Sequence, residues 1–135
     1  MAYFGKMFKF EKEDKYDELV KAAEKVDTKT FAFLSYKLSQ GIKKTGDNAY
    51  TLFFDAGNIK RELNFVPGVS FEDAFGANLQ SKTTITADGD TFTQVMDFGP
   101  KGTITMKREY TADALNVTVT TSFWDGVAVR RYVAA

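Results

Sequence analysis

Most of the chain after residue 37 alternates apolar and polar positions, which is the period of a β-strand with one buried face. Segments rich in Gly, Asp and Asn interrupt the alternation about every eight to twelve residues, a spacing typical of turns between short strands. These segments are 45–48, 55–58, 67–68, 88–89, 99–102, 111–113 and 125–126. Together with a short apolar segment at 7–10, the pattern predicts an antiparallel meander of short strands in a sandwich or barrel.

The segment between residues 14 and 37 has a helical period instead. Its apolar residues at three- and four-residue spacing are Tyr16, Leu19, Val20 and Ala23. Asp14 is a suitable N-cap for this helix, and Thr28 is a suitable cap for a second short helix that carries Phe31. Because only about two residues separate the helices, we expect a tight helix-turn-helix.

Several predicted strands carry a polar residue on their apolar face. Arg108 has the same parity as Ile104 and Met106, so it points to the interior of the protein. The same sorting by parity places further polar residues inside: Gln40, Arg61, Gln94, Arg130 and Tyr132. An unpaired guanidinium in an apolar interior costs several kcal/mol, so these groups require partners.

The interior arginines have more than one explanation. Arg61 lies near a turn, where its side chain could reach solvent or a bulge could shift the register. The other polar groups come from separate strands and need a shared acceptor. Asp73 could serve, and so could a bound carboxylate, because a guanidinium and a tyrosine hydroxyl bind a carboxylate well. We expect Asp73 and water to satisfy Arg108 and Arg130 only partly in the empty protein.

Composition narrows the function further. Lys+Arg and Asp+Glu both number 18 among 135 residues, and this balance argues against nucleic acid as a partner. His and Cys are absent, which removes the commonest general base and metal ligands, so we expect no metal site and no cofactor. Glu72 and Asp73 are strand neighbours that face opposite sides and cannot act as an acid–base couple, so we expect no enzyme. Without an apolar leader or an apolar run long enough to span a bilayer, we expect one cytoplasmic domain over residues 1–135.

Over its whole length the chain resembles the intracellular lipid-binding proteins, that is, the cytosolic fatty-acid-binding and cellular retinoid-binding proteins. The segments that carry the resemblance are Phe4-Gly5-Lys6-Met7, Tyr16-Asp17-Glu18-Leu19, Gly68-Val69-Ser70-Phe71-Glu72-Asp73, Gln94, Lys107-Arg108-Glu109 and Arg130-Arg131-Tyr132. The segment Trp124-Asp125-Gly126-Val127-Ala128 is most similar to insect gut members.

The resemblance implies a ten-stranded antiparallel up-and-down β-barrel around a water-filled cavity, capped by the helix-turn-helix. It also implies an intracellular, monomeric carrier of one long-chain fatty acid. Arg130 and Tyr132 would bind the carboxylate directly and Arg108 would add a second contact, with Gln40, Gln94 and Arg61 as further polar groups in the cavity. Retinoic acid or another hydrophobic carboxylate is the alternative ligand.

The resemblance further assigns an entrance to the cavity. The residues expected at this lid and portal are Tyr16, Leu19, Val20, Phe31 and Asn58, the last standing where family members often carry Phe. Exposed lysines on the predicted helices favour transient contact of the lid with anionic membranes.

Overall fold

The computed structural model describes residues 1–58, 60–74 and 80–135. The helical elements are α1 (Tyr16–Asp27), η1 (Ala32–Ser35) and η2 (Gly99–Lys101), and the strands are β1 (Phe8–Asp14), β2 (Ser39–Gly46), β3 (Ala49–Asp55), β4 (Lys60–Phe65), β5 (Phe71–Ala74), β6 (Gln80–Asp88), β7 (Thr91–Asp97), β8 (Thr103–Tyr110), β9 (Ala114–Thr121) and β10 (Trp124–Ala134). The two η elements are 3-10 helices.

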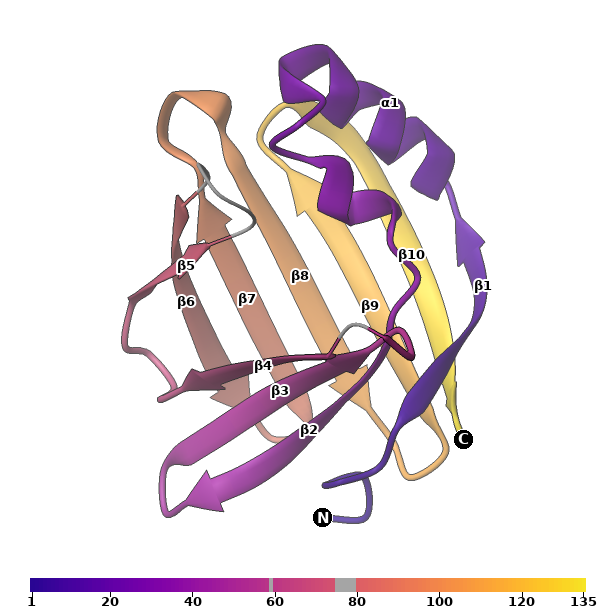
Figure 1. Cartoon of the computed structure of the whole chain (residues 1–135), viewed down its shortest axis with the longest axis vertical. Coiled ribbons are helices and arrows are strands. Elements are labelled where there is room, and N and C mark those ends of the chain that lie inside the picture. The colour runs from indigo at the N-terminus through magenta and orange to yellow at the C-terminus, as the bar shows by residue number, and fades with distance from the viewer. Residues whose placement is uncertain (59, 75–79) are drawn as a thin grey trace.

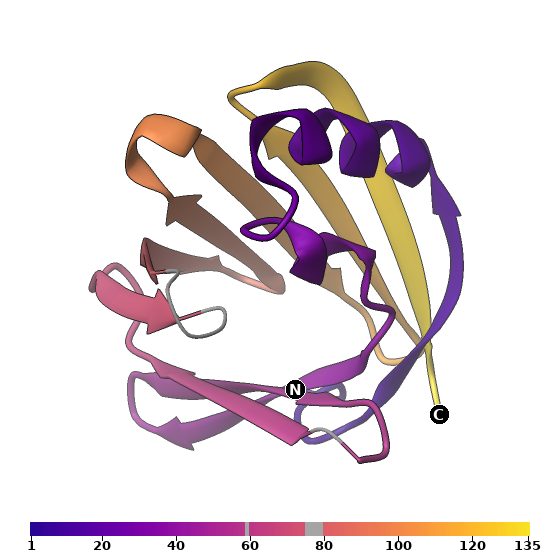
Figure 2. The same ribbon diagram turned by 45° about the horizontal axis from the view of Figure 1, so that its top comes forward.

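The ten strands form one antiparallel sheet in the order β4-β3-β2-β1-β10-β9-β8-β7-β6-β5. Consecutive strands are neighbours except for β4 and β5, which are the two edges of the sheet. Because β1 also pairs with β10, the sheet curves into a nearly closed barrel. Figures 1 and 2 show the strands β2–β4 lying across the interior from β6–β8. The predicted up-and-down barrel is therefore confirmed.

The lid, which we define as α1 and η1, covers one end of the barrel (Figure 2). Helix α1 forms because Tyr16, Leu19 and Ala23 bury one face against the barrel. Its N-cap is Lys15 in a left-handed conformation and not Asp14, because β1 continues to Asp14 in its pairing with β10. No described helix is long and apolar enough to cross a membrane.

The second element of the lid is shorter than the sequence predicts. Thr28 does not cap a new helix; its hydroxyl donates to the Glu24 carbonyl of α1 at 3.3 Å. Asp27 instead accepts the backbone N–H of Thr30 at 3.1 Å, which turns the chain, and only the 3-10 helix η1 follows. Four residues suffice to bury Leu34 over the barrel.

An aromatic cluster that includes Tyr3 lies near the N-terminus, at the end of the barrel away from α1 in Figure 1. Tyr3 stacks on Tyr110 with ring centroids 4.8 Å apart, and Tyr50 stacks on Phe65 at 5.6 Å. Phe92 joins the two pairs, since its ring lies 5.3 Å from Tyr50 and 5.9 Å from Tyr110. Because aromatic packing closes this end, the interior space lies towards the lid.

Candidate binding cavity

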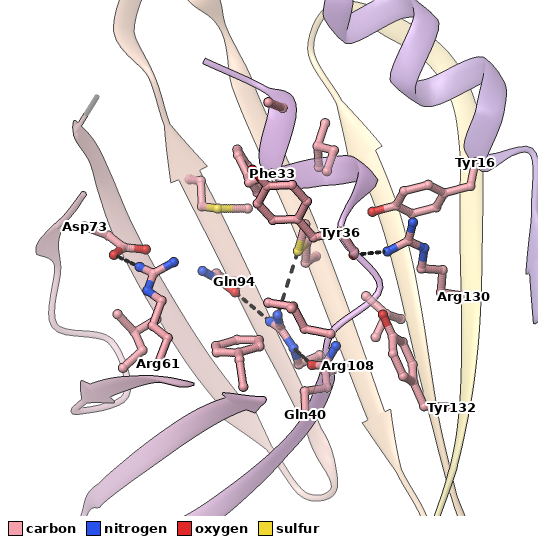
Figure 3. A pocket seen from close by; sticks show the side chains of 18 of the residues that line it. Tyr16, Phe33, Tyr36, Gln40, Arg61, Asp73, Gln94, Arg108, Arg130 and Tyr132 are labelled. Carbon is pink, nitrogen blue, oxygen red and sulfur yellow. Dashed lines mark hydrogen bonds and ion pairs between the residues drawn. The ribbon is translucent and has the colours of Figure 1, made fainter. Parts of the chain in front are cut away.

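A cavity of about 360 Å³ lies between the barrel wall and the lid. Its volume is within the roughly 300–1,000 Å³ typical of small-molecule sites. The apolar part of its wall includes Phe33, Leu38, Phe54, Leu63, Met96 and Met106. The cavity is also lined by residues predicted from parity or from the family resemblance. These are Tyr16, Gln40, Arg61, Gln94, Arg108, Arg130 and Tyr132 (Figure 3).

Arg108 lies on β8 and is 3% exposed. Its Nε donates to Oε1 of Gln40 at 3.0 Å, and its Nη1 donates to Oε1 of Gln94 at 2.6 Å. The remaining nitrogen lies 3.8 Å from the sulfur of Met106. Burial lowers the pKa of Arg108, but an arginine keeps its charge at neutral pH. Arg108 is thus a buried cation whose hydrogen-bond partners in the described chain are neutral.

Arg130 lies on β10, is 4% exposed, and connects the barrel to the lid. Its Nη1 donates to the Tyr36 carbonyl at 2.7 Å, directly after η1, and its Nε donates to Oε2 of Glu13 at 3.3 Å. The guanidinium carbon lies 3.6 Å from the ring centroid of Tyr16, the first residue of α1. Burial raises the pKa of Tyr16 to about 12, so the ring that covers Arg130 is neutral.

Glu13 reaches Arg130 because of a bulge in β1. Phe10 pairs with Tyr132, but the register then shifts by one residue, so that Glu13 pairs with Arg130. Strict alternation from Phe8 and Phe10 places Glu13 outside; the bulge turns it to the face of Arg130. The expectation that Asp73 partly satisfies Arg130 is therefore wrong, because the acidic partner of Arg130 is Glu13.

Tyr132 lies two residues after Arg130 on the same face of β10 and is 3% exposed. Its ring packs edge-on against Phe10 with centroids 6.1 Å apart. The hydroxyl points into the cavity between Arg108 and Arg130 (Figure 3). Two guanidinium groups and one hydroxyl from β8 and β10 therefore converge on one part of the cavity.

Asp73 does not pair with either of these arginines. It is 4% exposed on β5 and forms an ion pair with Arg61 of β4, whose side chain is 34% exposed. Arg61 therefore faces the cavity as its parity predicts, and no register slip displaces it. The two residues were both predicted to be internal, but their pairing with each other was not.

The predicted lid and portal residues separate into two groups. Tyr16 lines the cavity, whereas Leu19 is fully buried and Val20 is partly buried and packs against the core. Phe31 packs under the lid, with its ring 5.1 Å from Phe98 and 5.3 Å from Phe123. Asn58 is exposed and is not among the described residues that line the cavity. The sequence pattern did not single out Phe33 and Tyr36, because η1 has only four residues, too few to show a period, and Tyr36 follows it in an extended conformation.

An ion pair fastens the lid at the end of α1. Nζ of Lys101, in η2, lies 2.7 Å from Oδ2 of Asp27 and donates to the Thr30 hydroxyl at 2.9 Å. The Lys101 ammonium and the N–H of Thr30 hold the pKa of Asp27 well below its usual range. The lid is thus held at both ends, by Lys101 and by Arg130.

The chain also resembles known proteins along its whole length. It is 40% identical over 134 residues to fatty acid-binding protein 1 of Manduca sexta, covering 99% of this chain and 100% of that protein. The chain belongs to the fatty-acid-binding protein family. A second family member, fatty acid-binding protein 2 of Manduca sexta, is 38% identical over the same share of both chains. The resemblance recognised in the sequence is confirmed.

The structure agrees with this membership. The solved structure of a fatty-acid-binding protein isolated from Manduca sexta superimposes with a TM-score of 0.82, at 36% identity over 98% of this chain and 99% of that chain. A scan against protein-family models gives no match.

Proposed function

We propose that this protein is an intracellular carrier that binds one long-chain fatty acid in the cavity, with the carboxylate held by Arg108, Arg130 and Tyr132. The observation that carries the proposal is a buried guanidinium, Arg108, with neutral partners in a cavity of about 360 Å³. Membership of the fatty-acid-binding protein family supports it. We further propose that residues 1–135 act as one monomeric domain in the cytoplasm, and that the protein is a carrier and not an enzyme.

The charges in the cavity suggest separate roles for the two arginines. Arg108 has no acidic partner among the described residues, so it would supply most of the net attraction for an anion. Arg130 shares its charge with Glu13 but keeps N–H groups beyond the two that are used, and these could bind the carboxylate together with the Tyr132 hydroxyl. Gln40 and Gln94 would keep the Arg108 guanidinium in place. The acyl chain would lie along Phe33, Leu38 and Met96.

The head group can be tested by comparing ligands that share one chain. Oleate should bind with one molecule per protein, and oleyl alcohol and methyl oleate should bind at least about tenfold more weakly, because each hydrogen bond to a charged group contributes about 1.5–3 kcal/mol. The affinities of the three ligands are measured by displacement of a fluorescent fatty-acid analogue. Titration calorimetry gives the stoichiometry of oleate. Equal affinity for acid and alcohol contradicts the head-group site, and tighter binding of retinoic acid than of oleate favours the retinoid alternative.

The lid suggests how the ligand is delivered. Lys21, Lys25 and Lys29 are exposed in the second half of α1 and just after it. Asp17 and Glu18 are exposed in the first turn and Glu24 lies among the lysines, so the second half of the helix has the larger excess of exposed positive charge. We propose that this end touches anionic membranes transiently during transfer.

Reversing these three charges to Glu should slow the transfer of fatty acid to anionic vesicles several-fold, with little change in equilibrium affinity. The matched control reverses Lys9, Lys82 and Lys107, which are exposed on the strands. Transfer is followed by the fluorescence of an analogue quenched in the acceptor vesicles. A transfer rate that is the same in both variants, and insensitive to vesicle concentration, means that release occurs through water.

A further inference from the structure

The barrel has a seam between β4 and β5, the two edges of the sheet. No hydrogen-bonded ladder joins these strands among the described residues, whereas each of the other neighbouring pairs is hydrogen-bonded. In Figure 1 the two strands diverge from the link that connects them, residues 66–70. Arg61 and Leu63 on one side of the seam and Asp73 on the other line the cavity.

The link closes one end of the seam. The N–H of Gly68 donates to the Ile85 carbonyl at 2.9 Å, and the Ser70 and Thr84 hydroxyls lie 2.6 Å apart. Both contacts fasten the link to β6, so the edges cannot separate there without breaking them. Any opening of the seam must therefore be widest at its other end.

The ion pair between Arg61 and Asp73 crosses the seam away from the link. Arg61 precedes the end of β4 at Phe65 by four residues, and Asp73 follows the start of β5 at Phe71 by two. At about 3.3 Å per residue, the pair lies roughly 7–13 Å along the strands from the link. Since Asp73 is 4% exposed and Arg61 is 34% exposed, the pair extends from the cavity towards solvent.

An ion pair is not expected to stabilise this seam more than apolar side chains would. Buried charge pairs lose much of their attraction to desolvation, and apolar side chains of similar volume are often at least as stable. A charge pair does differ from apolar packing in that its two members can separate and become hydrated one at a time. That property suits a contact that opens and closes.

We propose that Arg61 and Asp73 form a clasp that controls how fast a fatty acid enters and leaves the cavity. This inference rests on the proposed carrier function. When the pair separates, β4 and β5 move apart at the end away from the link, and the cavity becomes accessible through the seam. The clasp is closed before and after exchange, so it changes the rates of binding and release more than the affinity.

Arg61→Gln and Asp73→Asn should each speed both association and dissociation of oleate, by about tenfold if opening becomes easier by 1.4 kcal/mol. The dissociation constant should stay within about twofold. The charge-swapped variant R61D/D73R should return both rates towards those of the wild type. Rates are measured by stopped-flow fluorescence with an anthroyloxy-labelled oleate.

The matched control is Glu62→Gln, which removes an exposed ion pair with Lys43 from the outward face of the same strand and should leave the rates unchanged. If a single variant fails to fold, R61Q/D73N carries the test, because it leaves neither charge uncompensated. Wild-type rates in R61Q/D73N overturn the clasp. A weaker affinity of R61Q with an unchanged association rate also overturns it and makes Arg61 a ligand contact. A wild-type protein that binds no oleate overturns the carrier function and the clasp with it.

Discussion

The Arg108→Gln variant should bind oleate about 30- to 700-fold more weakly than the wild type, which corresponds to about 2–4 kcal/mol. The reason is that the ligand carboxylate would remain buried after losing the one interior cation that has only neutral partners in the described chain. Fluorescence displacement with oleate measures the loss. The control is Lys107→Gln, which removes a positive charge from the outward face of the same strand.

The same variant should leave the ligand-free protein as stable as the wild type or more stable. Replacing Arg108 removes a desolvated charge, and the amide of the new glutamine can still donate to Gln40 or Gln94. Denaturant unfolding of the delipidated proteins measures the difference. A loss of several kcal/mol in stability, with unchanged affinity for oleate, would show that Arg108 is a structural residue and that the carboxylate binds elsewhere.

In contrast to Arg108→Gln, the Arg130→Gln variant should be less stable than the wild type. We expect weaker oleate binding, and also a loss of about 1–3 kcal/mol in the free energy of unfolding of the ligand-free protein. The loss arises because Glu13 would keep only its more exposed ion pair with Lys37. The Tyr36 carbonyl and the Tyr16 ring would also lose their contacts with the guanidinium. In Arg130→Gln, the backbone amides of the lid should also exchange with deuterium faster than they do in the wild type, and those of the barrel should change less.

Arg131→Gln is the matched control for Arg130. Arg131 is the next residue, its ion pair with Glu11 also has a separation of 3.3 Å, and its side chain is 40% exposed on the outer face. Exposed pairs contribute little, so this variant should lose no more than about 1 kcal/mol and bind oleate normally. If Arg130→Gln behaves like Arg131→Gln in both measurements, Arg130 neither holds the lid nor binds the carboxylate.

The antiparallel meander and much of its interior could be predicted from the residue pattern, and the family resemblance then indicated a barrel and not a sandwich. Alternation of period two and the turn residues between the strands depend on local backbone geometry, so they are visible without a structure. Parity alone placed Arg108, Gln94, Arg130 and Tyr132 inside. The structure brings all four to one cavity. Helix α1 was equally clear, because its buried residues recur at helical spacing.

The partners of the charged groups were decided only by the tertiary structure. A bulge of one residue in β1 turns Glu13 inward and gives Arg130 a counter-charge, and no pattern in the sequence marks that bulge. Asp73 pairs with Arg61 and not with Arg108, because the curvature of the barrel brings the two edges of the sheet, β4 and β5, to face each other across the seam. Parity tells which way a side chain points, whereas its partner depends on register and closure, which bring together residues distant in the chain.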